Sequence, residues 1–167
     1  MAKNTNTYGP AERHFDIACQ YKNAADLLHA QFYSGTNQLP IREPIYYLYH
    51  HAVELILKSF LHARHRGFRN THDVNVLYSM CCNEGMKVRD GHHFEVKNCI
   101  DLLRAGNRNH FYRYPVENKH AAPSLTWTCD VVTRLIEAVT PLVKSNAPRP
   151  STIRASLGKP TYSPLPR

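Results

Sequence analysis

The sequence lacks long hydrophobic runs, and in its 167 residues no stretch approaches the roughly 20 apolar residues that a membrane helix needs. Residues 1–6 also lack the apolar core of a signal peptide, so we expect a cytoplasmic protein with no membrane contact. The five cysteines include no Cys-x-x-Cys pair, which favours reduced thiols over a disulfide framework. Histidine is abundant, but no zinc-finger or deaminase spacing occurs, so we expect neither a metal ion nor another cofactor.

Acidic residues are scarce at the C-terminal end of the chain. The formal net charge is +8, and the stretch from Lys144 onward supplies five basic residues and no acid. Proline is frequent there, at positions 148, 150, 160, 164 and 166, which is typical of an extended, flexible segment. We therefore divide the chain into a flexible N-terminus (1–9), one folded domain (10–145) and a disordered, basic, proline-rich tail (146–167).

No segment of the predicted domain alternates with the period of a β-strand, whereas apolar residues recur every three or four positions throughout. This spacing predicts long helices over residues 11–33, 43–66 and 125–143, the second of which is apolar on most sides and therefore central. Two shorter helices are expected between them, one beginning at residues 71–73 and one over 94–103 that stops at Gly106. The predicted fold is all-α, an antiparallel up-and-down bundle of four to five helices.

Two motifs in the second and third predicted helices resemble the HEPN domain family. The first runs from Tyr49 to Leu61 and contains Ala52-x-Glu54-x-x-Leu57-Lys58; the second begins Thr71-His72-Asp73. The resemblance implies a small stand-alone HEPN-like bundle that forms a homodimer. It also implies an association with RNA cleavage, with toxin–antitoxin pairs or with antiviral defence, and a possible antitoxin or effector protein as partner.

Catalytic members of that family carry an Arg-x₄₋₆-His motif near the last helix. Three pairs here have this spacing, Arg66–His72, Arg104–His110 and Arg113–His120, which is about what chance gives, so their position must decide. Arg104–His110 fits the expected position best, although a glycine follows Arg104 two residues later. In a metal-independent endoribonuclease, Arg104 would stabilise phosphate charge and His110 would transfer the proton.

Further residues beside this pair suit RNA. Cationic side chains bind phosphates, and aromatic rings stack on unpaired bases. The candidates are Arg108, Phe111, Tyr112, Arg113, Tyr114 and Lys119. The alternative is that Arg104 pairs with Asp101 or caps its helix, and that the aromatic rings only pack the connector against the bundle.

Glu54 and Lys58 lie four residues apart on the apolar second helix. They could form a simple helix pair, or Glu54 could instead be partly buried and bonded to the connector, for example to Arg113. Because a buried carboxylate needs a partner, we favour a structural role for Glu54 over a catalytic one. Three functions stay open. The first is a HEPN-type endoribonuclease or toxin. The second is a non-catalytic module that binds RNA, a nucleotide or a partner protein. The third is a purely structural or antitoxin-like bundle with a large apolar patch.

Overall fold

The computed structural model describes residues 9–34, 41–68, 71–108, 112 and 121–146. It contains five α-helices, which are α1 (Pro10–Tyr33), α2 (Arg42–Ala63), α3 (Val74–Asn83), α4 (His93–Arg108) and α5 (Leu125–Asn146), with a 3₁₀ turn at Arg89–Gly91. The described residues include no strand, so the all-α expectation is confirmed. The predicted N-terminal segment (apart from Gly9) and all of the predicted tail except its first residue lie outside the described part.

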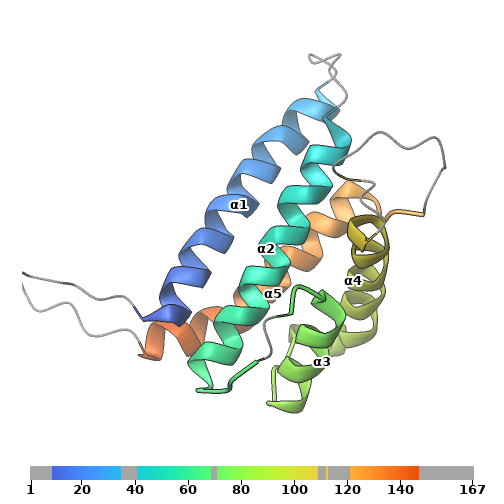
Figure 1. Cartoon of the computed structure of the whole chain (residues 1–167). Coiled ribbons are helices and arrows are strands. Elements are labelled where there is room, and N and C mark those ends of the chain that lie inside the picture. The colour runs from blue at the N-terminus through green and yellow to red at the C-terminus, as the bar shows by residue number, and fades with distance from the viewer. Residues whose placement is uncertain (1–8, 35–40, 69–70, 109–111, 113–120, 147–167) are drawn as a thin grey trace, which may run out of the picture.

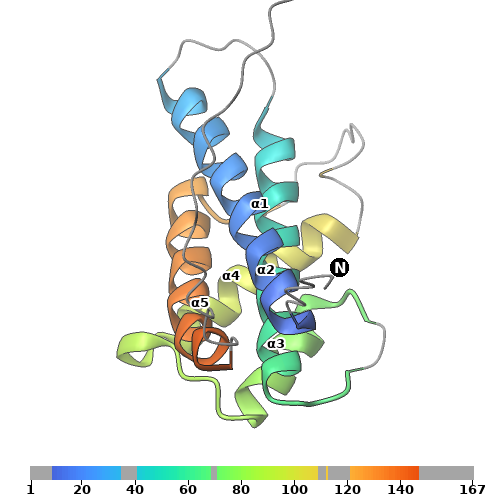
Figure 2. The ribbon, with the colours of Figure 1, turned by 90° about the vertical axis from the view of Figure 1, so that its left-hand side faces the viewer.

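Helix α2 is the central element, as its composition predicted. Every residue from Ala52 to Leu61 is buried, because α1, α3, α4 and α5 all pack against this helix. Figures 1 and 2 show α1 and α2 side by side in opposite directions, with α5 packed against both. Ser59 joins the start of α1 to α2 by donating from Oγ to the carbonyl oxygen of Ala11 at 2.8 Å.

Helix α3 departs from a strictly alternating bundle, because it runs in the same direction as α2. His72, just before α3, contacts Glu54, and farther along both helices the Cys81 Sγ atom lies 3.4 Å from the carbonyl oxygen of Leu57. The loop after α2 carries the chain back before α3 begins, as Figure 1 shows. One consequence is that the first turn of α3 faces the C-terminal half of α4, where Asp73 meets Arg104.

Two helix ends differ from the sequence-based expectation. Helix α2 ends at Ala63 and not near Gly67, because His65 adopts a left-handed conformation (φ 54°). The N–H of Arg66 then donates to the carbonyl oxygen of Leu61 at 2.9 Å, the long bond of a Schellman motif.

Gly106 does not stop α4, which continues to Arg108. A Cβ atom at Gly106 would lie 2.2 Å from Cζ of Tyr112. Gly106 therefore leaves space for the buried ring of Tyr112. The helix continues past the glycine, whose role is to let α4 pack closely against that ring.

Candidate functional site

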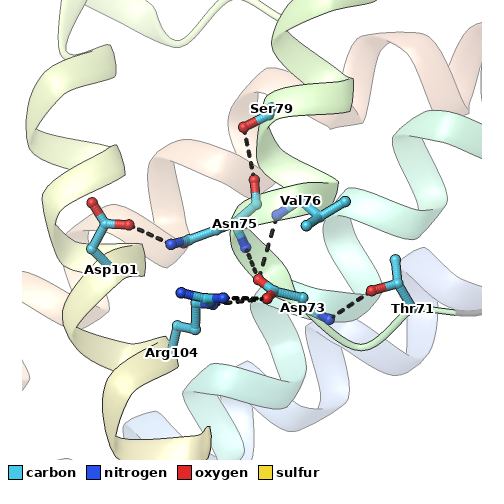
Figure 3. Close-up of polar contacts among 7 residues, drawn as sticks. All are labelled: Thr71, Asp73, Asn75, Val76, Ser79, Asp101 and Arg104. Carbon is cyan, nitrogen blue, oxygen red and sulfur yellow. Dashed lines mark hydrogen bonds and ion pairs between the residues drawn. The ribbon is translucent and has the colours of Figure 1, made fainter.

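Arg104, the predicted phosphate-binding residue, is held by Asp73. Its Nε and Nη2 atoms donate to Asp73 Oδ2 at 2.8 and 2.6 Å (Figure 3). The two side chains are only partly exposed, 35% for Arg104 and 28% for Asp73, so solvent screens the pair incompletely. The guanidinium group thus joins α4 to the beginning of α3, and the partner differs from the Asp101 that the sequence suggested.

Asp73 has a second task as the N-cap of α3. Its other oxygen, Oδ1, accepts from the backbone N–H groups of Asn75 at 3.0 Å and Val76 at 3.4 Å. Burial works to raise the pKa of Asp73, but the bonds from Arg104 and from these backbone groups prevail and lower it. The carboxylate therefore stays ionised and faces Arg104 with a full negative charge.

Asp101 and Asn75 extend this network. The side-chain amide of Asn75 donates to Asp101 Oδ1, as Figure 3 shows. Lys97 donates to the other oxygen of Asp101 at 2.7 Å. Arg104 and Lys97 thus each contact a carboxylate, Asp73 and Asp101, which offsets the positive charge that these two side chains could offer to RNA.

Glu54 is buried and surrounded by basic side chains. Lys58 Nζ lies 2.7 Å from its Oε1 atom and His72 Nδ1 lies 2.9 Å from the same atom, while His51 Nδ1 lies 3.8 Å from Oε2. Burial works to raise the pKa of Glu54, but the contacts with His51, Lys58 and His72 outweigh it and lower the pKa to about 2. Glu54 has Lys58 as a partner, which is one of the two arrangements that the sequence left open; Arg113, the alternative partner in the connector, lies outside the described residues.

Tyr112 lies in the core, only 5% exposed. Its ring stacks on that of Tyr46 at a centroid distance of 5.3 Å, next to Gly106. A base cannot stack on this ring unless it leaves the core, so the described geometry assigns Tyr112 to packing, the alternative that the sequence left open for these aromatic residues.

The structure does not describe the side chains of the other predicted site residues. The side chain of Arg108, at the end of α4, lies outside the described part of the chain. So do five whole residues: His110, Phe111, Arg113, Tyr114 and Lys119. Both members of the Arg66–His72 pair are described, and they contact different carboxylates: Arg66 Nε lies 2.9 Å from Glu84 Oε1, and His72 Nδ1 lies 2.9 Å from Glu54 Oε1.

Sequence reasoning missed the partners that hold the predicted residues. Asp73 precedes an apolar run and is a typical N-cap, so its capping role was readable. The pairing of Asp73 with Arg104, 31 positions away, was not readable from the sequence, because it depends on how α3 packs against α4. Glu12, which lies 7% exposed near the start of α1, also gave no signal, since a glutamate in the first helical turn is ordinary.

Comparisons of the chain with protein-family models, with curated proteins and with solved structures found no match. No described helix is long and apolar enough to cross a membrane. Within the same residues, no three His, Cys, Asp or Glu side chains are close enough together to share a metal ion.

Proposed function

We propose that this protein is a HEPN-like module that binds RNA as a homodimer and does not use Arg104 for cleavage. The observation that carries the second half of this proposal is the pair of bonds, 2.8 and 2.6 Å, from Arg104 to Asp73. A catalytic arginine stabilises charge that develops on phosphate, and its donors must be available when that charge appears. Here the donors on Nε and Nη2 already have an ionised partner.

The RNA-binding half rests on the sequence around the connector. Arg108, Arg113 and Lys119 alternate there with Phe111 and Tyr114, and basic residues also follow α5. Such a combination of cations and rings binds single-stranded RNA through phosphates and base stacking, with little sequence preference.

The second candidate is a metal-independent endoribonuclease that uses Arg104 and His110. It is supported by the 35% exposure of the Arg104 side chain, which leaves part of this side chain open to solvent. In this mechanism phosphate would have to replace Asp73, or share Arg104 with it, before His110 could transfer the proton.

Labelled single-stranded RNA in EDTA separates the two candidates. The module predicts binding that weakens with salt and leaves the RNA intact in the parent and in His110→Ala. Cleavage by the parent that His110→Ala abolishes would establish the enzyme in its place. Light scattering of the parent at several concentrations tests the homodimer, which fails if the mass stays that of one chain.

A charge-matched pair of variants tests where RNA binds. Arg108→Gln with Arg113→Gln removes two positive charges from the proposed surface, and Arg13→Gln with Lys87→Gln removes two exposed charges elsewhere. We expect the first variant to lower the slope of log affinity against log salt by about 1.4, at roughly 0.7 for each phosphate contact with a single strand. Equal losses in both variants would reject a localised surface.

A further inference from the structure

A pocket of about 490 Å³ opens between the end of α3 and the start of α4. It lies at the opposite end of this helix pair from the contact between Asp73 and Arg104. Its buried lining includes Tyr78 and Met86, which are 4% and 3% exposed. The volume is in the range of sites that hold small ligands.

Phe94 is the unusual residue of this pocket. It is 75% exposed, the largest value among the large apolar residues that the structure describes. A single exposed apolar side chain is ordinary on a protein surface, but this ring lines a pocket whose other walls include buried residues. A flat ring that enters the pocket can therefore stack on Phe94 and shield it from water.

The thiol and the imidazole of the pocket are not arranged for nucleophilic catalysis. The N–H of Val88 donates to His93 Nε2 at 3.4 Å, so the neutral ring carries its proton on Nδ1 and cannot use that nitrogen as a base. This Nδ1 atom lies 3.9 Å from Sγ of Cys82. Burial raises the pKa of Cys82, which keeps the side chain a thiol at pH 7. The pocket is thus suited to non-covalent binding.

Polar side chains of the pocket match the edge of a nucleobase. Ser79 Oγ donates to the carbonyl oxygen of Asn75 at 2.9 Å, and the hydroxyl oxygen keeps its capacity to accept a hydrogen bond. The side-chain amide of Asn83, which also lines the pocket, has both donors and an acceptor. A base presents the same mixture of donors and acceptors around its ring.

Lys97 adds a positive charge beside the ring of Phe94. It lies three positions after Phe94 on α4, and residues at this spacing share one face of a helix. Its Nζ atom is 2.7 Å from Asp101 Oδ2, but the two side chains are 56% and 38% exposed. Solvent screens such an exposed pair, so a phosphate group can compete with Asp101 for the ammonium.

We propose that this pocket binds the base of a nucleotide, with the base stacked on Phe94, its edge hydrogen-bonded to Ser79 and Asn83, and its phosphate at Lys97. A nucleotide fits better than a purely apolar ligand, because it combines a flat ring, polar groups on the edge of that ring and a negative charge. Aromatic rings and basic side chains bind nucleotides in this way.

The nucleotide can be free or part of single-stranded RNA. Both sources present the same base and phosphate to the pocket, so base binding can be tested before the source. The described residues that line this pocket do not belong to the RNA surface proposed above. The proposal therefore does not depend on RNA binding at the connector.

The test is an NMR titration of the full chain with adenosine 5′-monophosphate and with ribose 5-phosphate, which has the sugar and the phosphate but no base. We expect the nucleotide to shift the amide signals of Cys82, Phe94 and Lys97. Ribose 5-phosphate should bind at least about fivefold more weakly, as for the loss of one stacked base. Equal binding of the two compounds, or no shift at the pocket, would overturn the proposal.

Three variants locate the effect. Phe94→Ala should weaken nucleotide binding by about fivefold or more, whereas Phe94→Tyr, which keeps a ring, should retain it. Leu27→Ala is the matched control, because it shortens another highly exposed apolar side chain, 70% exposed on α1. Equal nucleotide binding by Phe94→Ala and Leu27→Ala would also overturn the proposal. Both positions are mostly exposed, so we expect both variants to fold.

A labelled single-stranded RNA of 12 nucleotides identifies the source. Weaker RNA binding by Phe94→Ala than by Leu27→Ala means that the pocket takes a base of RNA. Equal RNA binding, together with loss of nucleotide binding in Phe94→Ala, means that the ligand is a free nucleotide. If the parent binds no RNA, the proposed function fails, and the titration with adenosine 5′-monophosphate still decides whether the pocket binds a base.

Discussion

The Arg104–Asp73 pair offers the sharpest test of the structure, because one measurement bears on both stability and function. We consider Arg104→Gln, Asp73→Asn and the double variant. Asparagine is as good an N-cap as aspartate, so Asp73→Asn keeps the cap of α3 and removes mainly the charge that Arg104 faces. The two single changes therefore perturb the same interaction from α3 and from α4.

The expected magnitude follows from exposure and geometry. Fully exposed ion pairs contribute about 0.2–1 kcal/mol, and breaking a buried pair costs about 3–5 kcal/mol. With side chains 35% and 28% exposed and two short bonds to one oxygen, this pair lies between those limits, nearer the exposed one. We expect a coupling free energy of about 1–1.5 kcal/mol in a double-mutant cycle.

Urea unfolding of the four proteins, followed by circular dichroism and by the fluorescence of Trp127, gives the free energy of unfolding for each. Additive losses, with a coupling free energy indistinguishable from zero, would refute the reasoning and leave Arg104 available for phosphate. The same four proteins should bind RNA with similar affinity, since the proposed surface lies in the connector. A selective loss of RNA binding in Arg104→Gln would contradict the proposed function.

Three further predictions concern the core. Gly106→Ala should destabilise the protein by about 1–3 kcal/mol despite the better helix propensity of alanine, and it should become stabilising in a Tyr112→Ala background, where the clash is absent; thermal unfolding of the three variants measures this. Because the folded-state pKa of Glu54 is lowered to about 2, its contribution is complete above the unfolded-state pKa near 4.5 and is lost as pH falls from there towards 2. The free energy of unfolding, measured as pH is lowered, should thus decrease by about 2–4 kcal/mol less in Glu54→Gln than in the parent. Identical curves for the two proteins would rule out the lowered pKa. Tyr49→Phe removes a bond of 2.8 Å from the buried Tyr49 to the partly exposed Asp26 and should cost about 1–2 kcal/mol in urea unfolding; no loss would mean that water replaces the hydroxyl.

The fold class was predictable because it depends on periodicity along the chain. Helix α2 is the clearest example: its apolar residues on most sides required neighbours on most sides, and the bundle provides them. The N-cap of α3 was likewise readable from Asp73, since capping depends on residues a few positions apart. Information of this kind is local.

The predicted helix ends were wrong where contacts between residues farther along the chain determine the structure. Gly106 has the local signal of a helix end, but Tyr112 requires that the helix approach closely, and only a glycine gives the ring its space. Gly67 has the same signal, and the chain turned instead at His65, where the bond from Arg66 to Leu61 closes the helix. Glycine marks places without a side chain, and the sequence alone does not distinguish a turn from a close contact.

The segment Thr71-His72-Asp73 has a physical explanation that does not involve catalysis. This segment lies at the surface of the bundle, just before α3, and its side chains contact two helices. His72 reaches the buried carboxylate of Glu54 on α2, and Asp73 reaches Arg104 on α4 while capping α3. Two consecutive side chains thus fix the start of α3 to both neighbours, each through a charged partner. The Thr71-His72-Asp73 segment therefore takes part in packing α3 against α2 and α4, and its occurrence in the sequence is not by itself evidence for a cleavage reaction.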